Sequence, residues 1–156
     1  MEKATFAAGC FWGVQLGFDK LEGVISTIVG YMGGHTDKPT YEAICTGQTN
    51  HAEVVEVTFD PDIISFGQLL DHFWQDHNPT TLNQQGPDRG SQYRSAVYYH
   101  SDTQKAAAED SRAVCDASDL WPAPIVTEIT SAPQFWPAEE YHQKYLEKRN
   151  IAISCH

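Results

Sequence analysis

A glycine and a cysteine separate a short apolar run from a helical pattern near the start of the chain. The run Ala4–Ala8 is compact and apolar, which predicts a buried strand. Apolar residues then recur at the spacing of one helix face, at Phe11, Val14, Phe18 and Leu21. Gly9 permits a sharp turn of the backbone between the two elements. The sequence therefore predicts a strand, a tight turn and a helix, with Cys10 in the first helical turn.

The predicted position of Cys10 suits a reactive thiol. Backbone N–H groups and the positive end of the helix dipole favour an anion there, and the thiolate is the reactive form of cysteine. Core packing is the alternative, because many cysteines outside disulfides are small buried hydrophobic residues. Two large aromatic residues, Phe11 and Trp12, follow directly, and a helix with one buried face does not need both. We therefore expect Cys10 to be a nucleophile.

The length and charge of the chain limit the possible functions. The 156 residues suggest one domain that needs no disulfide or metal for stability. The formal net charge of −11 argues against binding to nucleic acid or to an anionic membrane surface. No apolar run approaches the ~20 residues of a membrane span, and the start has no signal-peptide pattern. We expect a cytoplasmic protein, or the catalytic core of a larger one, with a monomer as the default state.

Strand and helix patterns are mixed along the chain. Further strands are predicted over residues 24–32, 52–59, 95–99 and 125–130. Helical segments are predicted over 40–45, after capping boxes at Ser65 and Ser101, and from Pro137 to about Arg149. This mixture predicts an α+β domain over residues 1–156, in which a sheet is covered by helices. Residues 150–156 have no pattern and are expected to form a mobile tail.

The chain has four widely spaced cysteines, which are Cys10, Cys45, Cys115 and Cys155. None forms a Cys-x-x-Cys pair, and no Cys/His set has the spacing of a zinc site. We expect no metal and no cofactor. In a cytosolic chain such thiols are either inert core residues or residues used in redox chemistry.

The long polar segment 78–94 is the second informative feature. A segment of this length without regular structure is usually functional in a compact domain. It carries five polar side chains within seven residues, namely Asp88, Arg89, Gln92, Tyr93 and Arg94. A solvated surface loop is the alternative. That alternative fits Arg89 and Arg94 better than Tyr93, because a loop tyrosine next to glycines often supplies a hydroxyl donor to a pocket.

Three further segments carry weaker signals. Glu53 follows His51 at the mouth of a predicted strand, where the alternative is an edge carboxylate in water. The glycines of segment 30–34 permit close backbone approach, but an ordinary turn explains them equally well. Tyr41 follows a predicted turn, and packing at the start of a helix would also account for it.

Five sequence blocks together resemble the A-type peptide-methionine sulfoxide reductases. The blocks are Gly9-Cys10-Phe11-Trp12-Gly13, Gly30-Tyr31-Met32-Gly33-Gly34, Tyr41-Glu42 running to Cys45-Thr46-Gly47, His51-Ala52-Glu53, and residues 85–95, Gln-Gly-Pro-Asp-Arg-Gly-Ser-Gln-Tyr-Arg-Ser. Their order and approximate spacing match, and the resemblance extends over residues 5–145. It implies a two-layer α+β core with a ferredoxin-like mixed sheet, covering helices and long loops. It also implies reduction of the S epimer of methionine sulfoxide, free or within proteins, with thioredoxin as the reductant.

The resemblance also implies roles for individual residues. Cys10 would be the nucleophile, and Glu53 the acid that protonates the sulfoxide oxygen. The remaining implied roles are hydrogen bonding to that oxygen by Tyr41 and Tyr93, polarisation of the site through water by Asp88, and enclosure of the substrate methyl group by Phe11 and Trp12. This division suits the chemistry, because a sulfoxide sulfur is a poor electrophile until its oxygen is protonated or strongly hydrogen-bonded.

Attack on the sulfoxide leaves Cys10 as a sulfenic acid, which a second thiol must condense with. Cys155 is the candidate, since family members commonly carry a resolving cysteine in the C-terminal tail, and an exposed bystander is the alternative. The glycine-rich stretch usual before that cysteine is replaced here by residues 150–154. Cys45 and Cys115 are expected to pack in the core.

Two other classes of function fit parts of the sequence. In a thiol-based redox sensor, Cys10 and Cys155 would form a regulatory disulfide without turning over a substrate. In a Cys–His hydrolase, His51 would be the base for Cys10, but no residue would orient the histidine and the tyrosines would have no role. A pure binding module leaves the thiol at the start of a helix unexplained.

Overall fold

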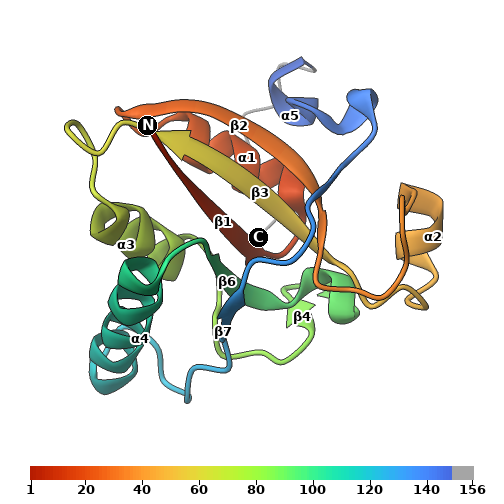
Figure 1. The fold of residues 1–156 in the computed structure, drawn as a ribbon. Coiled ribbons are helices and arrows are strands. Elements are labelled where there is room, and N and C mark those ends of the chain that lie inside the picture. Colours follow the sequence, from red (N-terminus) through yellow and green to blue (C-terminus); the bar gives the residue numbers. More distant parts are fainter. Residues whose placement is uncertain (149–156) are drawn as a thin grey trace.

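The computed structural model describes residues 1–148 and contains a six-stranded mixed sheet (Figure 1). The elements are β1 (Glu2–Ala8), α1 (Phe11–Asp19), β2 (Val24–Met32), α2 (Tyr41–Cys45), β3 (Ala52–Phe59), α3 (Phe66–Asp76), β4 (Gln84–Gln85), β5 (Asp88–Arg89), the 3-10 turn η1 (Ser91–Tyr93), β6 (Ser95–Tyr99), α4 (Asp102–Ala117), β7 (Glu128–Ser131), β8 (Trp136–Pro137), η2 (Glu140–His142) and α5 (Tyr145–Lys148). The strand order is β7-β6-β1-β3-β2-β8, and within residues 1–148 only β6 and β7 pair in parallel. The predicted α+β fold with a mixed sheet is therefore confirmed.

The core lies between the sheet and helices α1, α3 and α4. Phe6 of β1 is fully buried, and its ring centroid lies 4.9 Å from that of Phe18 on α1 and 5.2 Å from that of Phe73 on α3. One central aromatic residue thus joins two helices to the sheet. A second buried cluster includes Met32, Val54 and Tyr98, against which Phe135 packs. Both faces of the sheet are covered in its middle, which explains why β3 is buried along most of its length.

The strand register brings distant segments to one end of the sheet. The end of β1 lies beside the start of β6, because Ala8 pairs with Ser95. The start of β3 lies beside the end of β2, because Glu53 pairs with Tyr31. The turn that follows β1, the acid of β3 and the residues just before β6 are therefore close in space. This end of the sheet is where the sequence placed its candidate residues.

The helix predicted from Pro137 to about Arg149 is wrong. Pro137 lies in β8 and pairs with Gly30, and only the short elements η2 and α5 follow it within the described residues. Lys144 has a φ of 57°, a left-handed conformation that interrupts a helix. Pro137 favours the start of a helix locally, but pairing of its segment with the edge of β2 determines the structure.

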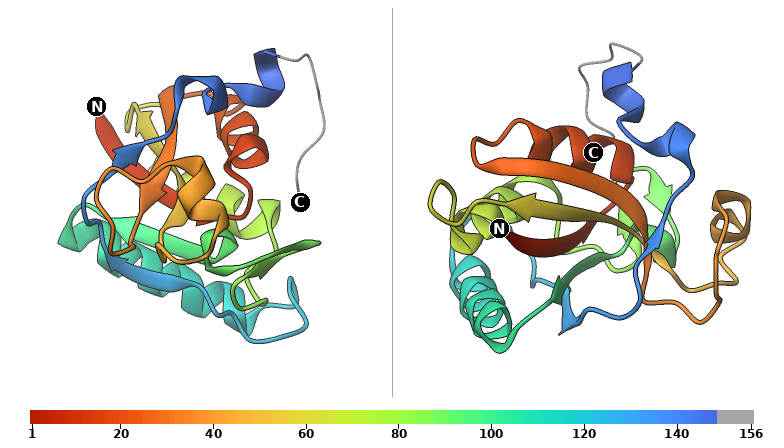
Figure 2. Two further views of the ribbon diagram at one scale, coloured as in Figure 1. Left: turned by 90° about the vertical axis from the view of Figure 1, so that its right-hand side faces the viewer. Right: turned by 45° about the horizontal axis from the view of Figure 1, so that its top comes forward.

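We call residues 136–146 the C-terminal strap. It runs along the outer side of β2 and ends beside α1 (Figure 2). Gly30 makes this approach possible, since a Cβ atom there would lie 2.5 Å from the Trp136 carbonyl oxygen. Within residues 1–148, no helix combines the length and the apolar character needed to cross a membrane.

Candidate active site

Cys10 is the N-cap residue of α1 and is half-buried. Gly9 before it has a φ of 97°, which glycine adopts without strain and other residues do not. The Cys10 carbonyl accepts the hydrogen bond of the Val14 N–H at 3.4 Å, as the first helical bond. The sequence predicted this junction correctly to within one residue. Cys10 therefore lies at the N-terminus of a nine-residue helix, where the first backbone N–H groups lack partners within the helix.

Glu53 is a buried carboxyl group next to this junction. Only 2% of the residue is exposed, so it is not the solvated edge carboxylate of the alternative interpretation. Its Oε1 accepts a hydrogen bond at 3.2 Å from the backbone N–H of Phe11, which directly follows Cys10. The structure thus places an acid and a thiol against the same helix terminus, although they are 43 residues apart in sequence (53 minus 10).

Tyr41 and Tyr93 approach the same carboxyl group from α2 and η1. Burial raises the pKa of Tyr41 well above its usual value, and the charge of Glu53 adds to the effect. Burial likewise raises the pKa of Tyr93, followed by the charges of Glu53, Asp88 and Cys10. Both hydroxyl groups therefore keep their protons and can act as hydrogen-bond donors at any physiological pH. Asp88 is the first residue of β5 in the two-stranded β4–β5 hairpin. It belongs to this group because its charge contributes to the raised pKa of Tyr93.

Aromatic side chains enclose the site on one side. Trp12 is partly exposed and stacks on Tyr145, with ring centroids 3.8 Å apart and planes inclined by 7°. Phe11 is 1% exposed, and its ring lies 5.7 Å from that of Tyr31 and 5.2 Å from that of His142. We call Trp12, His142 and Tyr145 the aromatic wall. Phe11 is thus buried behind the aromatic wall, whereas part of Trp12 remains exposed.

His142 was missed by the sequence interpretation. It is fully buried, and its Nδ1 accepts the Trp12 indole N–H at 2.9 Å. An indole N–H only donates, so Nδ1 carries no proton and the proton of the neutral ring is on Nε2. Burial lowers the pKa of His142, and the charge of Glu139 opposes this only in part. Nothing in the sequence indicated this role, because the segment was predicted as a helix and a histidine three residues before a tyrosine is ordinary there.

Glu139 was also missed, and it joins the strap to two site segments. Its carboxylate accepts the Tyr31 hydroxyl and the Tyr41 backbone N–H, each at 2.9 Å. Burial acts to raise the pKa of Glu139, but the hydrogen bonds from Tyr41, from its own backbone and from Tyr31, together with the nearby His142, outweigh it and the pKa is lowered. Burial and the bond to Glu139 raise the pKa of Tyr31. One ionised carboxylate therefore fixes α2, which carries Tyr41, against the sheet.

The cysteine predictions have mixed outcomes. Cys115 is 8% exposed and packs in the core, as expected. Cys45 is exposed, so its assignment to the core is wrong. It is the last residue of the short helix α2, which projects from the sheet, and its sulfur lies 4.0 Å from the Gln92 side-chain nitrogen. Cys155 lies outside the described residues.

His51 has a structural role rather than that of a base. Its Nδ1 accepts the Gly34 N–H at 2.9 Å, and its Nε2 lies 2.7 Å from the Thr36 carbonyl oxygen, to which it donates. Both ring nitrogens are therefore used in fixing the loop after β2. This leaves no nitrogen to deprotonate Cys10, which removes the motivation for a Cys–His hydrolase.

The site can present a thiol, a buried carboxyl group and two hydroxyl donors to a ligand in which a small polar group is next to an apolar one. The described residues contain no cluster of three or more His, Cys, Asp or Glu side chains that could hold a metal ion. The thiol, the buried carboxyl group and the two hydroxyl groups can together support thiol attack assisted by proton donation.

The chain resembles proteins of known family over its whole length. The family model described as peptide methionine sulfoxide reductase matches residues 2–156. A relative from Methanothermobacter thermautotrophicus, named peptide methionine sulfoxide reductase MsrA, is 62% identical over 147 residues, which are 94% of this chain and 87% of the relative.

Solved structures agree with this assignment. The crystal structure of reduced Mxr1 from Saccharomyces cerevisiae matches with a TM-score of 0.92 and 36% identity, covering 99% of this chain and 88% of that one. The same yeast protein in complex with Trx2 matches with a TM-score of 0.65 and 25% identity, covering 92% of this chain and 84% of that one. This chain therefore belongs to the peptide methionine sulfoxide reductase family.

Proposed function

We propose that this protein reduces the S epimer of methionine sulfoxide, free or in proteins, to methionine. The observation that carries the proposal is the hydrogen bond between the buried Glu53 carboxyl and the Phe11 N–H. It supports Glu53 as a proton donor that acts beside the Cys10 thiol at one helix terminus. Family membership gives the substrate class, and the site supplies the groups that the reaction requires.

In the proposed reaction, Glu53 protonates the sulfoxide oxygen while the Cys10 sulfur attacks the sulfoxide sulfur. The attack forms a bond between the two sulfur atoms. This bond and the sulfur–oxygen bond of the substrate then break as the protonated oxygen bonds to the Cys10 sulfur, so methionine leaves in reduced form and Cys10 is oxidised to a sulfenic acid. Tyr41 and Tyr93 donate hydrogen bonds to the oxygen as its negative charge develops. Asp88 polarises the site through water.

Phe11 and Trp12 bind the methyl group of the substrate in this proposal. A methyl group on sulfur is small and apolar, and burial against aromatic rings is favourable for it. The same rings limit the entry of water. The methyl group is held on the aromatic side and the oxygen on the side of Glu53. With both fixed, only one configuration at sulfur lets the rest of the methionine side chain point out of the site.

Recycling requires a second thiol, which we assign to Cys155. Its thiol would condense with the Cys10 sulfenic acid, so that a disulfide forms and water leaves. Thioredoxin would then reduce the disulfide by exchange. The yeast relative crystallised in complex with Trx2 supports this partner. Such a cycle suits a reducing compartment, and we propose that the 156 residues act there, in the cytoplasm, as one catalytic domain.

The decisive experiment is turnover of each epimer of a methionine sulfoxide peptide, with dithiothreitol as reductant. We expect methionine from the S epimer and at least about a hundredfold less from the R epimer, the scale of one lost hydrogen bond with a misplaced methyl group. Comparable rates on both epimers would contradict the pocket described above. Disulfide formation with peroxide but no methionine from either epimer would instead favour a redox sensor.

The tail assignment has its own test. A Cys155→Ser variant should release one equivalent of methionine and then stop when thioredoxin is the reductant. Cys115→Ser is the matched control, because Cys115 is a core thiol and should leave thioredoxin-driven turnover intact. Peptide mapping after one turnover should identify a Cys10–Cys155 disulfide. Full turnover without Cys155, or a disulfide from Cys10 to the exposed Cys45, would assign recycling elsewhere.

A further inference from the structure

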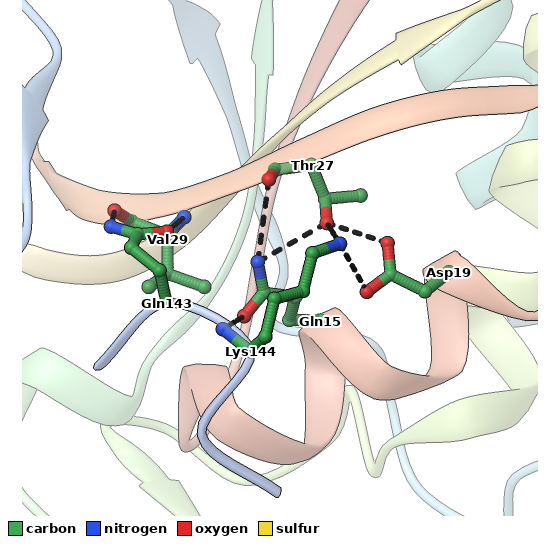
Figure 3. Close-up of polar contacts among 6 residues, drawn as sticks. All are labelled: Gln15, Asp19, Thr27, Val29, Gln143 and Lys144. Carbon is green, nitrogen blue, oxygen red and sulfur yellow. Dashed lines mark hydrogen bonds and ion pairs between the residues drawn. The ribbon is translucent and has the colours of Figure 1, made fainter. Parts of the chain in front are cut away.

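The edge of β2 is held by side chains of the C-terminal strap instead of a full neighbouring strand. β8 pairs with β2 only at Gly30 and Tyr31. At Val29 the Gln143 amide continues the pattern, since its oxygen accepts the Val29 N–H at 3.0 Å and its nitrogen donates to the Val29 carbonyl at 2.9 Å (Figure 3). One side-chain amide thus satisfies both backbone groups of an edge residue, as a strand would.

The next residue of the strap, Lys144, ties it to α1 and to β2. Its ammonium group lies 2.6 Å from Asp19 Oδ2 and donates to Thr27 Oγ1 at 2.9 Å, and its backbone N–H donates to Gln15 Oε1 at 2.7 Å (Figure 3). Thr27 in turn donates to Asp19 Oδ1 at 2.6 Å, and the Gln15 amide donates to the Thr27 carbonyl at 3.3 Å. We call Gln15, Asp19, Thr27 and Lys144 the latch.

The latch lies directly beside the aromatic wall. His142 and Tyr145, which hold Trp12 by a hydrogen bond and by stacking, flank Gln143 and Lys144 in sequence. Lys144 has a φ of 57°, so the backbone leaves the right-handed helical conformation there. The residues before and after Lys144 therefore point in other directions than they would in a continuous helix. Asp19 is on the same helix as Trp12, two turns further along. The latch therefore fixes the strap to α1, the helix that carries Trp12.

We propose that Lys144 and Asp19 are positioning residues for the substrate pocket: their ion pair holds the strap so that His142 and Tyr145 fix the Trp12 indole and complete the aromatic wall. The inference rests on the proposed function, because it concerns the methyl-binding side of the same site. Neither residue touches the reacting atoms. Without the ion pair the strap samples positions in which the wall is incomplete, and apparent affinity falls by the fraction of molecules that remain competent.

The test compares Lys144→Met and Asp19→Asn with the wild-type enzyme on the S epimer, with dithiothreitol as reductant. We expect KM to rise about fivefold in each variant, which corresponds to a competent population of about one-fifth, while kcat stays within about twofold. Lys148→Met is the matched control. Lys148 lies 3.7 Å from the exposed Glu140, an ion pair that does not reach the sheet or α1, so its KM should not change. The double variant should be no worse than either single one, because both remove the same link.

Two further variants separate positioning from stability. Lys144→Gly removes the side chain but suits a positive φ, so thermal stability should fall less than in Lys144→Met while KM rises equally. Lys144→Arg can still reach Asp19 and should keep a KM near that of the wild type. A wild-type KM in Lys144→Met, or a KM that follows melting temperature across the series, would overturn the inference. Absence of wild-type turnover would instead refute the proposed function.

Discussion

The two sides of the active site are built in different ways. The side that carries Cys10 and Glu53 consists of the β1–α1 junction and the start of β3, which are adjacent in the sheet and joined by backbone pairing and the Phe11–Glu53 hydrogen bond. The side that carries His142 and Tyr145 is the C-terminal strap, which meets the sheet through two strand pairs, one further backbone hydrogen bond from Ala138 to Val29, and otherwise through side chains.

This difference suggests a division of tasks. A nucleophile and an acid must keep their separation within a fraction of an ångström, and regular elements provide that rigidity. A wall for a methyl group needs only surface contact, and a segment held by side chains is sufficient. Variants on the sheet side should therefore lower kcat, whereas variants on the strap should raise KM. The following predictions can contradict that division.

The largest effect is expected for Cys10→Ser. The hydroxyl group replaces the sulfur with little change in volume, so the fold should persist, but a serine hydroxyl is a very poor nucleophile without an adjacent base. We expect the rate of methionine formation to fall by more than about four decades. The measurement is single-turnover methionine release, with circular dichroism to confirm the fold. Residual turnover of a few per cent would reject Cys10 as the nucleophile.

Glu53→Gln should have the next largest effect. Glutamine can still accept the Phe11 N–H, so the geometry at the helix terminus is kept, but it has no transferable proton. We expect kcat to fall by about two to four decades, the usual contribution of a positioned general acid, with KM changed little. A kcat near that of the wild type would remove Glu53 from this role, and a large rise in KM alone would contradict the division of tasks.

The sheet side of the site was predictable because its signals are local. The apolar run before Gly9, the helical spacing after Cys10 and the alternating apolar residues of β3 each depend on neighbours in sequence. Antiparallel pairing then brings Glu53 to Cys10 as a consequence of the topology. The sequence also indicated Tyr41 and Tyr93, although their closeness to Glu53 became visible only in the structure.

The strap was not predictable in the same way. Pro137 is favourable at the start of a helix, and nothing local in the sequence opposes a helix after it. The structure depends instead on partners far along the chain, such as Val29 for Gln143 and Asp19 for Lys144. Because these contacts are polar and irregularly spaced, they leave no periodic pattern. The exposure of Cys45 was missed for a related reason, since the five residues of α2 are too few to show an apolar period, and Ile44 rather than Cys45 is the buried one.

The two tyrosines test the boundary between the two sides. Tyr93 belongs to η1, directly before β6, whereas Tyr41 begins α2, whose first N–H is held by Glu139 of the strap. Tyr93→Phe and Tyr41→Phe should each lower kcat about tenfold, the scale of a hydrogen bond to a group that becomes charged. Tyr41→Leu removes in addition the ring whose centroid lies 4.4 Å from that of His142 in the wall, so this variant should also raise KM, unlike Tyr93→Leu. Equal effects on KM would show that α2 belongs to the rigid side.

The smallest predicted effect is a pH dependence of substrate binding. Burial lowers the pKa of His142 in the folded protein below its usual value of about 6.5. At pH values above the pKa of the folded protein's His142, the ring is neutral and Nδ1 accepts the Trp12 indole N–H. Protonation places a second donor opposite the indole, so the bond is lost. The unfolded chain takes up this proton first, and the corresponding stability is therefore present above about pH 6.5 and decreases as the pH falls.

We therefore expect the half-saturating substrate concentration to rise about threefold to fivefold as the pH falls through the folded pKa of His142. Single-turnover methionine release is the appropriate measurement, because it needs no reductant whose own reactivity varies with pH. His142→Gln is the matched variant, since its amide oxygen can accept the indole N–H but does not titrate. Its half-saturation should be nearly independent of pH. If His142→Gln kept the acid-side rise, the dependence would come from the groups around Cys10, and binding could not be assigned to the strap alone.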